Sequence, residues 1–128
     1  MAERRMMIGE VAERLGTSAR ALRHYEQEGL LSPVRGPNGY REYGDTDVVR
    51  AGNIRELLDL GLTTADVHQY LMEGCLDQPL SSGRRCVAEL VTVRQRLETL
   101  DDLILRLHRT RDRLAQHATR LERDAQNP

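Results

Sequence analysis

The sequence predicts a mainly α-helical protein: a winged helix-turn-helix head followed by a long C-terminal coiled-coil dimerisation helix. Three observations support this prediction. Two short helical patterns are separated by a glycine turn, a small hairpin rich in Arg and Tyr comes next, and a heptad repeat fills the last third of the chain. We expect the winged head over residues 1–73, a linker over 74–84 and the dimerisation helix over 85–128.

The first 31 residues predict a helix, a tight turn and a second helix. The first helix has an apolar face with i, i+3, i+4, i+7 spacing, formed by Ile8, Val11, Ala12 and Leu15. Gly16 supplies a left-handed stop, and Thr17 or Ser18 can cap the second helix, which runs to about Glu28. One polar face of that second helix is formed by Arg20, Arg23, His24 and Gln27.

Residues 32–44 predict a small hairpin that resembles a wing. Pro33 stops the preceding helix, Asn38-Gly39 is a strong turn signal, and Tyr40 and Tyr43 favour strand. Both arms also carry an arginine, Arg35 and Arg41. Guanidinium, phenol and backbone amide groups all suit phosphate oxygens, so this hairpin is a candidate for contact with a DNA backbone.

Two further helices complete the predicted head. One runs over 46–60 with Asp45 as its cap, and a shorter one follows a capping pair formed by Thr63 and Asp66. The Gly, Pro and Ser content of residues 74–84 is typical of a linker.

The C-terminal third carries two seven-residue series offset by three residues. Nine of their ten positions are apolar, and no Gly or Pro interrupts residues 87–127. A helix of about 40 residues extends ~60 Å, too long for a small head to cover, so we expect a second copy as its partner. The alternative is a helix that folds back on its own head. The predicted dimerisation residues are Leu90, Val93, Leu97, Leu100, Ile104, Leu107, Leu114, Ala118 and Leu121.

Charge is unevenly distributed behind a net charge of −1. Residues 4–41 carry seven arginines against four acidic residues, residues 42–77 carry two against eight, and residues 78–128 carry ten against seven. The chain contains no lysine, so every basic side chain apart from histidine is a guanidinium, the group best shaped for phosphate and guanine.

Composition excludes several classes of protein. The chain has 128 residues, of which 39% are hydrophobic and 30% charged, as in folded globular proteins. No apolar run approaches the roughly 18 residues of a membrane span, and a signal-peptide core is absent from the start, so we expect a cytoplasmic protein with no membrane partner. Without a phosphate loop, a Cys/His nucleophile arrangement or metal-ligand spacing, we do not expect an enzyme.

Two sequence blocks carry a resemblance to a known family. Leu22-Arg-His-Tyr-Glu in the second helix and Gly39-Tyr-Arg-Glu-Tyr in the hairpin, with their spacing, closely resemble the MerR family of bacterial transcription regulators. The resemblance implies a short-form member, without an appended ligand-binding domain, whose long helices pair antiparallel in a homodimer. Its partner would be double-stranded promoter DNA with an overlong spacer, bent and untwisted for RNA polymerase in response to a signal. An architectural, excisionase-like DNA-binding protein is the alternative.

The resemblance also assigns candidate DNA contacts. Arg20 and Arg23 would meet the major groove, while Tyr25 would brace against phosphate. For each residue the alternative is an ordinary surface ion pair or a packed ring; Glu26, for instance, could pair with Arg23. The complete predicted set is Ser18, Arg20, Arg23, His24, Tyr25, Arg35, Gly39, Tyr40, Arg41 and Tyr43.

Departures from the family pattern concern packing and the signal. Ala51 and Asn53 are smaller or more polar than usual, so we expect looser packing there. Cys86 matches the first cysteine of the family's metal and redox sensors, but no cysteine follows it. Cys75 and Cys86 could bind a soft ion such as Cu(I), oxidise to a disulfide, or be buried thiols without a function. The sequence predicts no definite cofactor.

Overall fold

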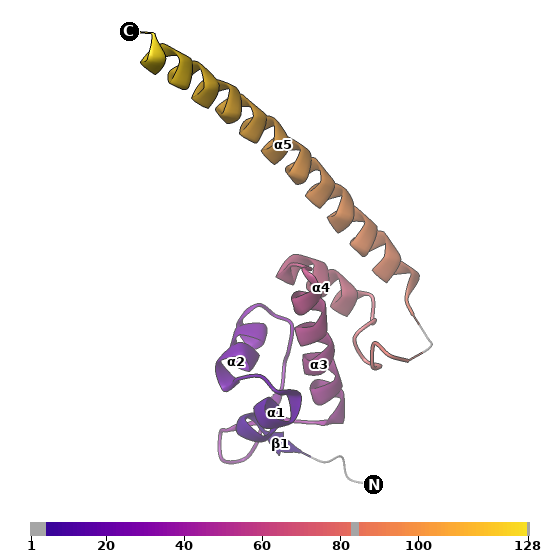
Figure 1. Cartoon of the computed structure of the whole chain (residues 1–128). Coiled ribbons are helices and arrows are strands. Elements are labelled where there is room, and N and C mark those ends of the chain that lie inside the picture. Colours follow the sequence, from indigo (N-terminus) through magenta and orange to yellow (C-terminus); the bar gives the residue numbers. More distant parts are fainter. Residues whose placement is uncertain (1–4, 83–84, 128) are drawn as a thin grey trace. The chain divides into compact units, whose positions relative to one another are not determined.

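The computed structural model describes residues 5–82 and 85–127, in two compact units, Met1–Val93 and Arg94–Pro128 (Figure 1). Within the described residues the fold is mainly α-helical, with a short three-stranded sheet in the first unit and a long C-terminal helix, as the sequence predicts. None of the described helices is both long enough and apolar enough to cross a membrane. The elements are β1 (Met6–Met7), α1 (Ile8–Leu15), α2 (Ala19–Gln27), β2 (Val34–Arg35), β3 (Arg41–Tyr43), α3 (Asp45–Leu60), α4 (Thr64–Met72) and α5 (Val87–Gln126).

The predicted helix-turn-helix is present, and local signals set its boundaries. Gly16 ends α1 in the left-handed region at φ 67°, a conformation that glycine adopts without steric cost. Ser18 is the cap of α2, because its hydroxyl accepts a hydrogen bond from the Ala21 backbone N–H at 3.1 Å. Leu22 and Tyr25 are buried, and they anchor one face of α2 in the core.

The wing is part of a sheet with one more strand than the sequence predicts. Strand β3 lies between β2 and β1 and is antiparallel to both, with Met6 opposite Tyr43. Strand β1 has only two residues, too few to show an alternating pattern. Tyr40 was expected in a strand but lies in the turn, where the Gly36 N–H donates to its carbonyl oxygen at 2.8 Å.

Helix α3 begins differently from the prediction, whereas α4 begins as expected. The N-cap of α3 is Gly44 rather than Asp45, and its backbone N–H donates to the Asp47 carboxylate at 2.9 Å. An acceptor at the third helical position therefore satisfies the free N–H. At α4, the Thr63 N–H donates to Asp66 at 2.9 Å and the Asp66 N–H donates to the Thr63 hydroxyl at 3.2 Å. The predicted capping pair is confirmed.

The segment after α4 packs into the core, although its composition is typical of a linker. Leu76 is fully buried, and the Asn53 side-chain amide donates to the carbonyl oxygens of Leu76 and Gln78, both at 2.8 Å. The Asn53 side-chain oxygen accepts the Leu80 N–H at 3.3 Å. Whether the head is packed more loosely at Ala51 and Asn53 stays a prediction, but neither residue is exposed. Ala51 is fully buried, and the polar Asn53 binds the backbone of this segment.

Helix α5 carries the heptad pattern on side chains that are mostly exposed. The leucine and isoleucine positions of the two series are 40–64% exposed. These positions are Leu90, Leu97, Leu100, Ile104, Leu107, Leu114 and Leu121. Val93 differs from them because it is half-buried and packs against the core of the first unit.

Candidate nucleic-acid interface

One face of α2 presents polar groups to solvent while its opposite face is anchored in the core. A shallow surface hollow follows this polar face and is lined by Ser18, Arg20, Ala21, Arg23, His24 and Gln27. Arg20, Arg23 and His24 are exposed. Over residues 5–82 and 85–127, no acidic side chain forms an ion pair with Arg20 or Arg23. Their donors face outward from a rigid helix.

An ion pair connects this helix to the wing. The Arg41 Nε atom of β3 lies 2.5 Å from the Glu26 Oε2 atom of α2. The contact with the Glu26 carboxylate raises the pKa of the Arg41 guanidinium above its ordinary value. Glu26 thus pairs with Arg41 instead of Arg23, the neighbour that the sequence suggested. The pair holds the wing strand against α2. It also leaves the Arg23 side chain available for contact with a partner molecule.

The tip of the wing is exposed. Tyr40 is 64% exposed, and Gly39 adopts a φ of 82°, which glycine takes readily. Arg35 is also exposed, and its Nη1 atom donates to the Gly39 carbonyl oxygen at 3.2 Å, across the turn. The Tyr40 phenol and the Arg35 guanidinium are therefore both exposed on the wing and available to phosphate oxygens.

Two of the predicted contact residues are buried instead of exposed. Tyr43 is fully buried, and its hydroxyl has no hydrogen-bond partner among the described residues. Tyr25 is 6% exposed. Burial is the main cause that raises the pKa of both phenols. The structure places these rings under the interface, and contact of either with phosphate stays a prediction.

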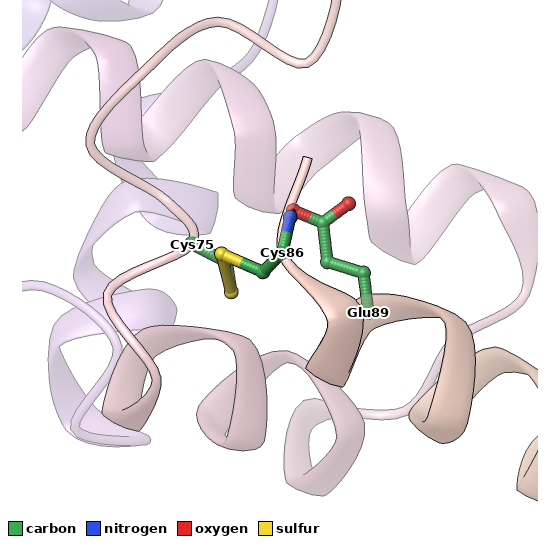
Figure 2. Close-up of side chains that lie close together, drawn as sticks. All are labelled: Cys75, Cys86 and Glu89. Atoms are coloured by element: carbon green, nitrogen blue, oxygen red, sulfur yellow. A yellow bond between two sulfur atoms is a disulfide. The ribbon is translucent and has the colours of Figure 1, made fainter. Parts of the chain in front are cut away.

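The two cysteines meet at the start of α5. Cys75, just after α4, and Cys86, just before α5, form a disulfide with a Cα–Cα distance of 5.9 Å (Figure 2). Of the three alternatives left open by the sequence, the structure shows the disulfide. Glu89 lies beside the pair: one ligand atom from each of the three residues lies within 4.8 Å of the others. Glu89 is not predicted from the sequence, because a single acidic residue in a first helical turn is common.

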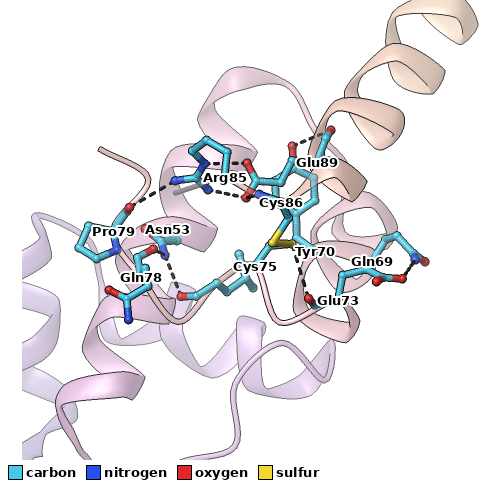
Figure 3. Close-up of a disulfide and its surroundings, with 11 residues drawn as sticks. Asn53, Gln69, Tyr70, Glu73, Cys75, Gln78, Pro79, Arg85, Cys86 and Glu89 are labelled. Carbon is cyan, nitrogen blue, oxygen red and sulfur yellow. Dashed lines mark hydrogen bonds and ion pairs between the residues drawn. A yellow bond between two sulfur atoms is a disulfide. The ribbon is translucent and has the colours of Figure 1, made fainter. Parts of the chain in front are cut away.

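A hydrogen-bond network surrounds the disulfide (Figure 3). The Arg85 guanidinium binds both carboxylate oxygens of Glu89, at 2.9 and 2.5 Å, and donates to the Leu80 carbonyl oxygen at 2.8 Å. The Tyr70 hydroxyl of α4 donates to the Glu89 carbonyl oxygen at 3.3 Å. The first turn of α5 is thus held by hydrogen bonds as well as by the disulfide.

Comparisons with known proteins find one matching family, similar regulators and a similar solved structure. Residues 6–73 match the family described as MerR HTH family regulatory protein. A probable heavy metal-dependent transcriptional regulator of Haemophilus influenzae is 32% identical over 112 residues, which cover 84% of this chain and 86% of that protein. The regulator HmrR of Rhizobium leguminosarum is 41% identical over 66 residues, and the match covers 52% of this chain and only 51% of HmrR. The crystal structure of PbrR691 from Ralstonia metallidurans, in complex with lead(II), is similar with a TM-score of 0.69 and 25% identity, over 87% of this chain and 84% of that one.

Proposed function

The chain belongs to the MerR family of helix-turn-helix regulatory proteins, and from that premise we propose that it acts as a homodimer on a promoter with an overlong spacer. Members of this family are DNA-binding transcription regulators and not enzymes. The observation that supports the proposal most directly is the exposed arginine face of α2, beside a wing that Arg41 and Glu26 hold in place.

In the proposed complex, α2 enters the major groove. Leu22 and Tyr25 fix the helix in the core, so Arg20 and Arg23 project from a support that moves little. Guanidinium groups form bidentate hydrogen bonds with guanine, which makes these two residues the candidates for base recognition. Arg35 and Tyr40 at the wing tip, and Ser18 at the start of α2, would contact phosphates and set the register on the duplex.

The second copy in the proposed dimer covers the apolar face of α5. Seven large aliphatic residues of the heptad series are 40–64% exposed, which is costly for a free helix in water. A heptad seam along a 40-residue helix matches a partner with the same repeat. Because one chain supplies one such helix, the simplest partner is another copy, and the family resemblance favours an antiparallel pair.

Two heads joined in this way would contact two half-sites and change the DNA between them. Bending and untwisting the spacer would bring the two promoter elements into register for RNA polymerase. The energy of that deformation depends on base pairs that the protein never touches. The architectural, excisionase-like alternative is not favoured, since the family match covers the head and the long helix adds a dimerisation element.

Footprinting of the full chain on its own promoter region tests the proposal. We expect protection of a palindromic site lying within an overlong spacer, together with hypersensitive positions at its centre where the DNA is distorted. Sedimentation of the same complex should give two chains per site. A footprint without a palindrome, or binding by single chains only, would contradict the proposed function.

A further inference from the structure

We propose that Cys75 and Cys86 form a reversible dithiol–disulfide switch that controls the start of α5 and, through it, the response of the regulator at its promoter. This inference rests on the proposed function and identifies its signal as an oxidant. Figure 2 shows the two sulfur atoms joined directly before the first turn of α5.

The cysteines are placed for bond formation by contacts that do not involve sulfur. The segment between them is bound to α3 by the Asn53 side chain and by an ion pair between Arg50 and Asp77, with 2.6 Å between Nε and Oδ1. The Cα–Cα distance of 5.9 Å falls in the usual range for a disulfide. Since these contacts remain when the bond is reduced, the two thiols stay close together and can oxidise again.

The bond holds the first turn of α5 within the first unit. Cys75 follows α4 and is 5% exposed, whereas Cys86 is half-buried and lies one residue before Val87, where α5 begins. The Arg85–Glu89 ion pair and the hydrogen bond from Tyr70 hold the same turn. The disulfide is the only covalent link in this group of contacts besides the chain itself.

Reduction changes the distance between the two sulfur atoms. A disulfide bond is about 2 Å long, whereas unbonded heavy atoms separate to roughly 3.5–4 Å. At least one of the two sulfur atoms must therefore move by about 1.5 Å. Cys75 is almost completely buried, so the movement falls mainly on Cys86, the residue that directly precedes α5. Helix shifts of about 1–2 Å are typical of switching transitions in regulators.

Hydrogen peroxide is the oxidant that would convert the two thiols into the disulfide. The Cys86 thiolate is the better nucleophile because it is more exposed and precedes a helix N-terminus, which favours the anion. It attacks one peroxide oxygen, the O–O bond breaks, and the hydroxide that leaves takes up a proton to give water and a sulfenic acid. The Cys75 thiolate then attacks the Cys86 sulfur, the S–O bond breaks and a second water leaves. Two thiols are oxidised by two electrons, and one peroxide is reduced to two waters.

The experiment compares the full chain in its reduced and oxidised states. Protein reduced with a phosphine and protein treated with hydrogen peroxide are assayed for free thiols, for promoter affinity and for transcription in vitro. We expect the loss of two free thiols per chain on oxidation and a change of about 5–150-fold in promoter affinity or transcript yield, the usual range of allosteric coupling. The matched controls are Cys75→Ser, Cys86→Ser and the double variant, which should bind the promoter but respond less than twofold to peroxide. The double variant also reports any effect of methionine oxidation.

The outcomes separate this inference from the proposed function. If the disulfide forms but the two states bind and transcribe equally, the switch is overturned and the proposed function stands. If neither state binds the promoter, the proposed function is overturned, and the switch with it. A response of the reduced protein to Cu(I) that needs both cysteines, with no response to peroxide, would also overturn the switch and favour a soft-metal site.

Discussion

At the scale of single residues, the candidate interface separates side chains that are available to a partner from side chains that support them. Arg20 and Arg23 project from α2 and lack ion-pair partners among the described residues, whereas Arg41 is paired with Glu26. The family motif assigns all of these residues to DNA contact, but only the structure shows that Arg41 also joins two elements. Each residue therefore has a distinct expected phenotype.

Arg23→Ala should weaken binding to the promoter site by about 1–3 kcal/mol if its guanidinium pairs with a base. The loss should be much smaller on unrelated duplex DNA, because base recognition is lost while phosphate contacts remain. Fluorescence anisotropy on both duplexes at one salt concentration measures the difference. An equal loss on both duplexes would show that Arg23 contacts phosphate, and Arg94→Ala, at an arginine outside α2 and the wing, serves as the matched control.

Tyr43→Phe tests the buried hydroxyl that has no partner among the described residues. Burial raises the pKa of Tyr43 above its ordinary value of 10.0, so the folded state keeps the phenol protonated at a pH where the unfolded chain ionises. The contribution of the protonated Tyr43 phenol to the free energy of unfolding is therefore fully present below pH 10. It is lost as the pH rises through the folded pKa. Urea unfolding between pH 8 and 11 should show that Tyr43→Phe reduces this loss and costs little at pH 8. Tyr40→Phe, at an exposed ring, should keep the wild-type pH profile.

At the scale of elements, the segment after α4 illustrates how one polar side chain organises a loop. Its Gly, Pro and Ser content indicates a free linker, yet Asn53 uses its amide group and its side-chain oxygen to bind three backbone groups of this segment. An asparagine at a position where apolar residues are usual looks like a packing defect in the sequence. In the structure it satisfies backbone groups that burial would otherwise leave without partners.

Asn53→Ala should lower the free energy of unfolding by about 1–3 kcal/mol, since it leaves buried carbonyl groups unsatisfied. Asn38→Ala, which removes one exposed turn contact to the Tyr40 N–H, is the matched control and should cost less. Chemical denaturation of both variants measures the difference. Equal losses would contradict the role assigned to Asn53, because its hydrogen bonds would then add no more stability than one exposed turn contact.

At the scale of the whole molecule, the proposed dimer depends on which face of α5 is apolar. Large aliphatic side chains are exposed at the heptad positions, but also at Leu103 and Leu105, outside the two series. Exposure alone therefore does not identify the contact face of α5. The seven-residue spacing identifies it, because positions at that spacing stay on one side of a supercoiled helix.

Leu107→Glu should dissociate the dimer, whereas Leu105→Glu should not. The two leucines are similarly exposed in one chain, at 60% and 50%, so the substitutions match in chemistry and differ only in heptad position. Removing a buried leucine costs about 1.5–3 kcal/mol, and the dimer would lose two of them. Sedimentation equilibrium should show at least a 100-fold weaker dimer for Leu107→Glu. If both variants dissociate equally, the predicted seam is wrong.

The sequence by itself determined the features that depend on neighbouring residues. Gly16, Ser18 and the Thr63–Asp66 pair mark helix ends through local hydrogen bonds and backbone conformation, and the heptad repeat marks α5. The arginine face of α2 follows from helical spacing in the same way, because a regular helix converts sequence intervals into positions on a face.

The tertiary structure decided what depends on residues far apart in the sequence. The Cys75–Cys86 bond, the pairing of β1 with β3, the burial of Tyr25 and Tyr43, and the pairing of Arg41 with Glu26 all require distant segments to meet. Local periodicity carries no information about such meetings, because the packing of the whole head selects them. The charge pattern illustrates both levels: the sequence places an excess of arginine in residues 4–41, and the fold decides which of these arginines remain available for DNA.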